Sequence, residues 1–267
     1  MARDARGIQS IEVGGRILSA LMHASGPMML RDLASAANLA PAQCHGYLTS
    51  FKNIGLVEQD SRSGFYQLGH FALRLGIGRI RGVELLNSAS QAIYALSEEL
   101  GFMALMVVWG PHGPTIVQVS EGTSPLTLNI RQGTLFSVTG TASGIVFGAY
   151  GNHEGMERII HSEINGQSRS HSFGKIPPRR TYDSAVKKAR DLGYAETVGA
   201  PIPGISAVSA PVFNRQSKLE LVITLIGRTE DMPVDEQSVA VQKLLSVTST
   251  LSENSTTGHN DTVAVIG

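Results

Sequence analysis

Apolar residues recur at helical spacing in three successive runs near the start of the chain. They comprise residues 11–22, then Leu30, Leu33, Ala34 and Ala37, and then a run that begins near Ala40. A spacing of three and four residues places such side chains on one face of a helix. The pattern therefore predicts three amphipathic helices that share one small core.

The third helix has clear start and stop signals. Asn38 is suited to end the preceding helix, Pro41 fits a first helical turn, and Gly55 ends the run. Its apolar stripe consists of Cys44, Tyr47, Leu48 and Phe51. We therefore expect a small, polar opposite face with Gln43 and Lys52 at its flanks, made of Ala42, His45, Gly46, Thr49 and Asn53.

Two strand-like runs, residues 56–60 and 65–69, follow this helix and are joined by a short turn that contains Arg62 and Ser63. Three helices and a hairpin in this order predict a winged helix-turn-helix domain over residues 8–69. In such domains the second helix of the motif enters the major groove and the wing meets phosphates. The predicted DNA-contacting residues are Ala42, Gln43, His45, Gly46, Thr49, Lys52, Arg62 and Ser63.

The remaining chain mixes strand and helix patterns. A glycine-rich, helix-like stretch at 70–87 is interpreted as a linker, and residues 88–253 as a second domain. Strands are predicted at 102–109, 115–119, 126–130, 206–213 and 219–226, and the aperiodic tail 254–267 is expected to be poorly ordered. A glycine-rich loop leads into a buried helix within 140–150, and further helices are expected at 89–100, from a Thr181 cap to Gly193, and at 240–251. The predicted fold class is α+β.

Composition limits the partners. The chain of 267 residues is 42% hydrophobic, enough for two cores, and its single cysteine excludes an internal disulfide. No apolar stretch is long enough to span a bilayer and no signal peptide is recognisable, so a cytoplasmic protein without membrane contact is expected. Residues 1–81 hold 9 basic and 5 acidic residues, a balance of +4, against 13 and 17, a balance of −4, in residues 82–267. The excess positive charge coincides with the predicted DNA-binding domain.

Patterns for catalysis or metal binding are incomplete. Ser143 lacks the glycines two residues before and two residues after it that a nucleophile elbow requires. No pair among His153, His161 and His171 has the four-residue spacing of a helical zinc site. We therefore expect no catalytic centre, no metal and no cofactor. The second domain instead offers hydroxyl groups on short loops and one strand, which suit a small-molecule pocket: Thr139, Thr141, Ser143, Ser206, Ser209 and Thr224.

From Val13 to about Leu251 the chain resembles the IclR family of bacterial transcription regulators. The resemblance rests on the order of several segments: GLVEQD and SGFYQLG in the wing, RQGTLFSVTGTASGIVFGAY, DLGYAET, GISAVSAPVFN and LELVITLIGR. It implies a homodimer or dimer of dimers that binds a double-stranded DNA operator. It also implies a C-terminal effector domain with a curved antiparallel sheet, flanked by helices, that holds a small organic or aromatic acid.

The family's effector pocket, carried over position by position, falls on Thr141, Ala142, Ser143, Gly144, Ile205, Ala207, Thr224 and Ile226. The chain departs from common family patterns at three positions. Gly46 stands where an arginine is common, Ile145 where lysine is common, and Ile226 where a hydroxyl residue can occur. The two isoleucines favour an aromatic or larger ligand over an acid of two or three carbons.

The resulting hypothesis is a repressor or activator in which effector binding changes operator binding through the linker. Two alternatives remain open. One is an enzyme acting on a small organic acid, fused to a winged helix. The other is a winged helix that serves only dimerisation or contact with another protein.

Overall fold

A computed structural model describes residues 7–24, 26–81, 84–124, 126, 128–167 and 176–257. The chain forms two compact units, Met1–Val83 and Glu84–Gly267. Among the residues described, no helix is long and apolar enough to cross a membrane. Of the segments considered above, His171 and residues 258–267 lie outside the described part.

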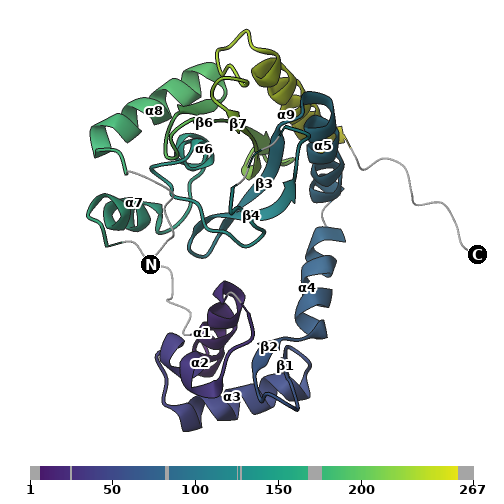
Figure 1. The fold of residues 1–267 in the computed structure, drawn as a ribbon, viewed down its shortest axis with the longest axis vertical. Helices are drawn as coiled ribbons and strands as arrows, with labels where there is room; N and C mark the ends of the chain where they lie inside the picture. The colour runs from purple at the N-terminus through teal and green to yellow at the C-terminus, as the bar shows by residue number, and fades with distance from the viewer. Residues whose placement is uncertain are drawn as a thin grey trace, which may run out of the picture. The chain divides into compact units, whose positions relative to one another are not determined.

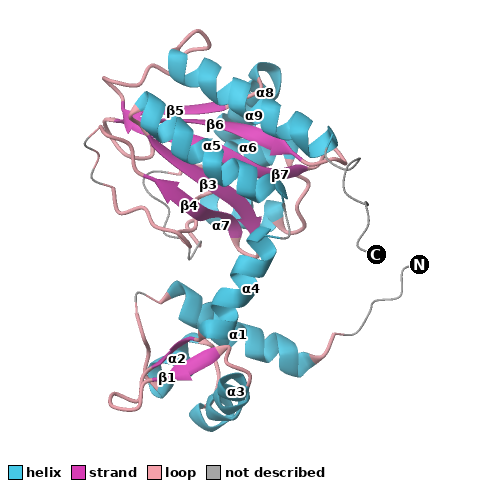
Figure 2. Ribbon diagram, turned by 90° about the vertical axis from the view of Figure 1, so that its right-hand side faces the viewer, coloured by secondary structure: helices cyan, strands magenta, loops and turns pink. Residues whose placement is uncertain are grey.

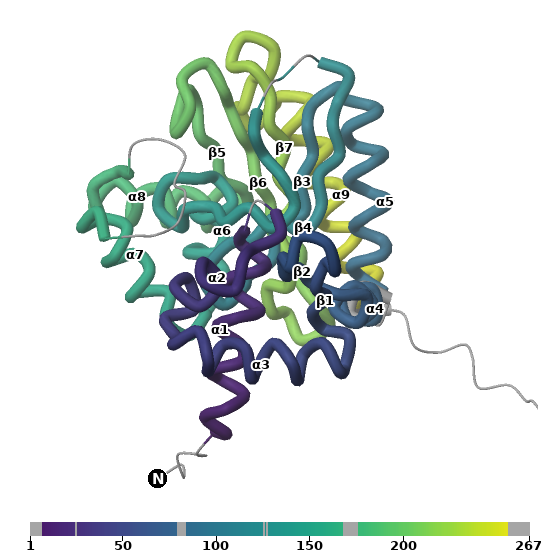
Figure 3. The backbone as a smooth tube through the Cα atoms, turned by 60° about the horizontal axis from the view of Figure 1, so that its bottom comes forward, coloured from purple at the N-terminus to yellow at the C-terminus, as the bar shows by residue number. Residues whose placement is uncertain are grey.

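The N-terminal unit contains the three predicted helices and the hairpin. They are α1 (Gln9–His23), α2 (Leu30–Ala36), α3 (Pro41–Asn53), β1 (Val57–Gln59) and β2 (Tyr66–Leu68), with β1 and β2 antiparallel (Figure 3). Ile17, Leu33, Cys44 and Leu48 are fully buried and join the helices in one core. Tyr66 ties the hairpin to this core, because its backbone also pairs with Met28. The unit is a winged helix-turn-helix.

Two turns in this unit have the backbone geometry that the sequence signals require. Asn38 adopts a left-handed conformation with φ 54° after α2, and Pro41 opens α3. Gly55 follows α3 with φ 74°. The backbone of Gly69 approaches Gly55 so closely that an added Cβ would lie 2.4 Å from the Gly55 carbonyl oxygen. The wing therefore leaves the core through two glycines that pack backbone on backbone.

The stretch interpreted as a glycine-rich linker is mostly helical. Helix α4 spans His70–Arg81 and includes Gly76 and Gly78 without interruption. Three large apolar residues on it, Leu73, Leu75 and Ile77, are exposed. The next helix, α5 (Glu84–Leu100), begins earlier than the periodicity predicted and ends at Gly101, which has φ 74°.

The C-terminal unit is built on a five-stranded antiparallel sheet in the order β4-β3-β7-β6-β5 (Figure 2). The strands are β3 (Met103–Gly110), β4 (Gly113–Ser120), β5 (Ala195–Val198), β6 (Ile205–Phe213) and β7 (Leu219–Arg228). Helices α5 and α9 (Val239–Thr257) cover one face, and α6 (Ala142–Tyr150) and α8 (Arg179–Leu192) cover the other (Figure 1). Helix α7 (Met156–Ile164) packs beside them through Ile160.

Several local predictions need correction. Leu126 and residues 128–130 form no strand but run irregularly past the sheet. Helix α8 begins at Arg179, so Thr181 lies inside its first turn and is not the cap. Arg179 pairs with Glu157 and Asp183, both at 2.8 Å, which favours the earlier start. Helix α9 continues to Thr257, beyond the predicted start of the tail.

Candidate functional site

The exposed face of α3 carries the residues predicted to contact DNA. Ala42, Gln43, His45, Gly46, Thr49 and Lys52 are all exposed, whereas Cys44 and Leu48 point into the core. The Thr49 hydroxyl donates to the His45 carbonyl at 2.9 Å. Apart from its chain neighbours and the adjacent backbone of α3, no atom lies within 4 Å of the position that a Cβ on Gly46 would occupy. This face is therefore shallow and uncharged in its first two turns.

Lys52 links α3 to the wing. Its ammonium donates to Gln59 Oε1 at 2.7 Å, and Gln59 Nε2 donates to the Gly64 carbonyl at 3.0 Å. Both ends of the wing turn are thus held to the same helix. An ammonium has three donors, so Lys52 retains donors for a phosphate while this bond is in place.

An aspartate organises the tip of the wing. Asp60 Oδ1 accepts from the Ser63 amide at 2.6 Å, the Ser63 hydroxyl at 2.8 Å and the Arg62 amide at 3.0 Å. These bonds, the Ser63 amide first, hold the pKa of the exposed Asp60 carboxyl below its ordinary value. The Ser63 hydroxyl is already used within the turn, which leaves Arg62 as the side chain free to extend from the tip.

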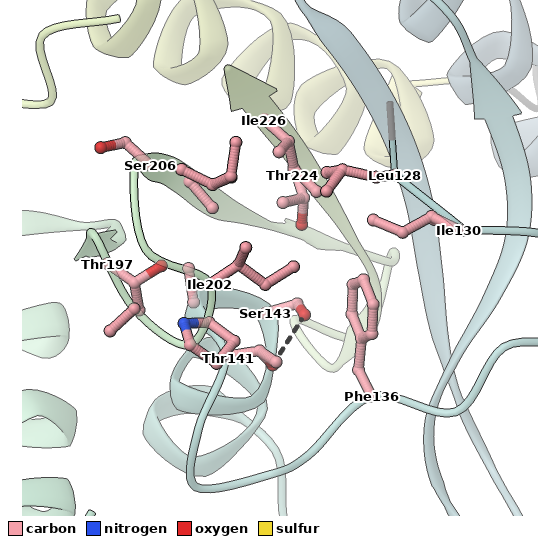
Figure 4. Close-up of a pocket in the computed structure, with 15 residues that line it drawn as sticks. Leu128, Ile130, Phe136, Thr141, Ser143, Thr197, Ile202, Ser206, Thr224 and Ile226 are labelled. Atoms are coloured by element: carbon pink, nitrogen blue, oxygen red, sulfur yellow. Dashed lines mark hydrogen bonds between the residues drawn. The ribbon is translucent and has the colours of Figure 1, made fainter. Parts of the chain in front are cut away.

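The second site is a cavity between α6 and the sheet in the C-terminal unit (Figure 4). It encloses about 450 Å³ of space between protein atoms, part of it open to solvent. Its apolar walls come from Leu128, Ile130, Phe136, Ala142, Ala200, Pro201, Ile202, Ile205, Ala207 and Ile226. None of the described residues that line it is charged.

Strand register brings distant residues together along one wall. Thr197 on β5 pairs with Ala207 on β6, which pairs with Ile226 on β7. The irregular segment at 128–130, predicted to be a strand, supplies Leu128 and Ile130 to the opposite side. Both side chains line the cavity although the segment forms no strand.

The start of α6 forms the polar end of the cavity. Thr141 is the N-cap, and its Oγ1 accepts from the Gly144 amide at 3.1 Å and donates to the Ser137 carbonyl at 2.7 Å. The Ser143 hydroxyl lies 3.3 Å from Thr141 Oγ1 and faces the cavity (Figure 4). The amides of Ala142 and Ser143 belong to a first helical turn, where the helix offers no acceptor. The Ser143 hydroxyl is the donor of this turn that visibly faces the cavity.

The other hydroxyls of the cavity differ in what they already bind. Thr224 Oγ1 lies 2.8 Å from Ser209 Oγ, and the Ser206 hydroxyl donates to Thr229 at 3.0 Å and points away from the cavity. Thr197 Oγ1 is buried and has no hydrogen-bond partner. It is the hydroxyl in the wall that most clearly requires a partner from a ligand or water.

Seven of the eight predicted effector residues line this cavity. The exception is Gly144, which lies behind it: an added Cβ would be 2.3 Å from the carbonyl oxygens of Ser137 and Val138. Sequence reasoning missed Thr197, Phe136 and Ile202. The segment containing Thr197 shows no strand alternation, so its place in the sheet was not detectable from the local pattern.

A winged helix-turn-helix unit followed by an α+β unit with a small cavity defines a DNA-binding regulator with a separate effector domain. Two family models match: the IclR helix-turn-helix domain over residues 10–61 and the C-terminal domain of the bacterial transcriptional regulator IclR over residues 78–253. The chain therefore belongs to the IclR family of bacterial transcriptional regulators.

Individual relatives agree with this family. The chain is 28% identical to the glycerol operon regulatory protein of Streptomyces coelicolor over 227 residues, which cover 85% of this chain and 87% of the relative. It is 28% identical to Pseudomonas aeruginosa HmgR, with a TM-score of 0.58 and coverage of 94% and 100% of the two chains.

A third comparison supports the fold. The structure of an IclR homologue from Microbacterium hydrocarbonoxydans, complexed with 4-hydroxybenzoate, matches with a TM-score of 0.72 at 14% identity. The match covers 92% of this chain and 98% of that chain.

Proposed function

We propose that this regulator responds to a small organic acid, with an aromatic or similarly apolar body, that binds in the cavity at the start of α6. One observation carries the proposal: the first turn of α6 lines an apolar, uncharged cavity and presents the Ser143 hydroxyl to it. Family membership supports a role in transcription. The 4-hydroxybenzoate held by the Microbacterium homologue supports the ligand class.

The chemistry of the two ends matches such a ligand. A carboxylate at the start of α6 would accept from the Ala142 and Ser143 amides and from the Ser143 hydroxyl, and it would gain from the helix dipole. An aromatic ring would lie against Phe136, Ile202 and Ile226. Because no lining arginine or lysine supplies a full charge, apolar burial must provide much of the affinity, which disfavours the smallest acids.

Calorimetry with matched ligands tests this assignment. 4-Hydroxybenzoate is expected to bind, whereas 4-hydroxybenzyl alcohol, which lacks the carboxylate, is expected to bind about tenfold or more weakly. Pyruvate and glycerol serve as small comparators. Ser143→Ala is expected to weaken the binding of 4-hydroxybenzoate. Ser97→Ala, on α5, is the control and should leave this binding unchanged. Equal affinity for the acid and the alcohol would contradict the carboxylate assignment.

We infer further that the α3 face and the wing bind the operator. Gln43, His45 and Thr49 are exposed and suited to base edges, with Ala42 and Gly46 permitting close approach. Lys52, Arg62 and the Ser63 region are suited to phosphates. A labelled fragment of the flanking upstream DNA should be retarded by the protein, with affinity that falls steeply as salt rises. Lys52→Ala should lower the salt slope by about one, and an unchanged slope would exclude that contact.

The proposed assembly is a homodimer or a dimer of dimers. In the N-terminal unit, large apolar residues are exposed on α1 and α4: Ile11, Leu73, Leu75 and Ile77. Ile11 is 71% exposed and Leu73 is 62% exposed, and an exposed group of apolar side chains can mark a surface that a partner covers. Sedimentation should find at least a dimer, and Leu73→Asp should shift it toward monomer. A monomeric wild-type protein at micromolar concentration would oppose this proposal.

A further inference from the structure

A buried carboxylate holds the loop that leads into the cavity. Glu163, near the end of α7, is only 2% exposed. Its Oε1 accepts from the Val138 amide at 2.9 Å. Its Oε2 accepts from the Ser137 hydroxyl at 2.8 Å, the Thr139 amide at 2.9 Å and the Thr139 hydroxyl at 2.7 Å. One side chain thus binds three consecutive residues of a segment that carries no regular structure.

Hydrogen bonds within the loop connect Glu163 to the start of α6. Ser137 Oγ also accepts from the Gly140 amide at 2.9 Å, and the Ser137 carbonyl accepts from the Thr141 hydroxyl at 2.7 Å. Thr141 in turn caps α6 through the Gly144 amide. A continuous chain of hydrogen bonds therefore joins Glu163 to the cap of α6, whose first turn bounds the cavity.

Packing reinforces the same connection. Space for a Cβ on Gly144 is already taken by the carbonyl oxygens of Ser137 and Val138, each 2.3 Å from the ideal Cβ position. The backbone of α6 therefore rests directly on the backbone that Glu163 holds. A displacement of residues 137–138 would displace the first turn of α6 as well.

We propose that Glu163 is a positioning residue of the effector site, acting through the 137–141 loop on the amides and hydroxyls at the start of α6. The assignment to effector binding rests on the function proposed above. The binding of the loop by Glu163 does not rest on that function, because it follows from the hydrogen bonds of Glu163 alone. An ionised carboxylate only accepts hydrogen bonds, and here all four partners donate.

Glu163→Gln tests this role with almost no change in volume. The amide group must turn its NH2 toward at least one N–H or O–H that now donates to Glu163, so at least one of the four hydrogen bonds to the loop is lost. The control is Leu96→Ala on α5, across the sheet from α6. It removes buried apolar volume from the same unit without touching the loop.

Hydrogen exchange of the full-length protein measures directly how well the amides of the loop are protected. In Glu163→Gln, amides of residues 138–144 are expected to exchange about tenfold faster relative to amides of β6, the change that one lost hydrogen bond to a charged group produces. Leu96→Ala, which lowers the stability of the unit as a whole, should not raise that ratio. Ser137→Ala should raise the exchange ratio by a smaller factor. This variant provides the test if Glu163→Gln does not fold. An unchanged ratio in the variant tested, or an equal rise in Leu96→Ala, would overturn the proposal.

Binding of 4-hydroxybenzoate supplies the second readout. Its dissociation constant should rise about tenfold in Glu163→Gln and stay at the wild-type value in Leu96→Ala. Faster exchange with unchanged affinity would mean that Glu163 orders the loop without positioning the site, and would overturn the proposal. If the wild type binds no 4-hydroxybenzoate, the proposed ligand class fails, while the exchange ratio still decides whether Glu163 holds the loop.

Discussion

Replacing Thr197 by valine separates stability from binding in the cavity wall. The Thr197 hydroxyl is buried on β5 and has no hydrogen-bond partner, although it lines the cavity. A buried polar group without a partner costs about 1–3 kcal/mol. Valine has nearly the same shape and lacks the hydroxyl, so Thr197→Val should raise the free energy of unfolding by about 1 kcal/mol.

The same substitution should weaken binding of the effector. If the ligand supplies the partner that Thr197 lacks, losing that hydrogen bond costs about 0.5–1.5 kcal/mol, or up to about tenfold in affinity. Denaturant unfolding without ligand and calorimetry with 4-hydroxybenzoate measure the two effects. Thr197→Val is expected to raise the free energy of unfolding and to lower the affinity for 4-hydroxybenzoate.

Thr224→Val is the matched control. The Thr224 hydroxyl is paired with Ser209 at 2.8 Å, and Ser209 is fully buried, so valine would leave Ser209 without this partner. This variant should lose about 1–3 kcal/mol of stability. If Thr197→Val were destabilising to the same degree, the hydroxyl would have a partner and the reasoning about the wall would be refuted.

Three further predictions concern other parts of the chain. Gly46→Ala on the open face of α3 should stabilise the N-terminal unit by about 0.5–1 kcal/mol, measured by thermal or urea unfolding. Gly144→Ala should cost about 1–3 kcal/mol because the methyl group meets two carbonyl oxygens at 2.3 Å; stability equal to wild type would contradict this packing. Burial lowers the pKa of His153, which stacks on Trp109 at 4.4 Å. The unfolded imidazole therefore takes up its proton first, and stability should fall as the pH drops through about 6.5. His153→Gln should flatten that fall, and an unchanged pH profile would rule the histidine out.

The periodicity of the sequence determined the N-terminal unit. Ile17, Leu33 and Leu48 each belong to the apolar stripe of a different helix, and each is fully buried. Local backbone chemistry determined where several elements end, because Gly101 and Gly193 adopt the left-handed conformation that stops a helix. These features depend on near neighbours in the chain, so the sequence contains them directly.

The start of α8 and the place of β5 depended on tertiary contacts. Arg179 begins α8 where it can pair with Glu157, 22 residues away in the chain, and no local signal marks that pairing. Strand β5 is short, and its membership of the sheet follows from its register against β6. Local propensity therefore predicted a cap at Thr181 and no strand at 195–198.

The cavity beside α6 shows the same division most clearly. Seven of its residues followed from the resemblance to known regulators, but Thr197 joins the wall only because β5 pairs with β6 and β6 with β7. Glu163 reaches the 137–139 loop from α7 across 24 to 26 residues of sequence. Patterns along the chain determine which segments can be helices, strands and turns. Which distant polar groups meet is decided by packing, because a buried donor or acceptor must find its partner wherever the fold brings one.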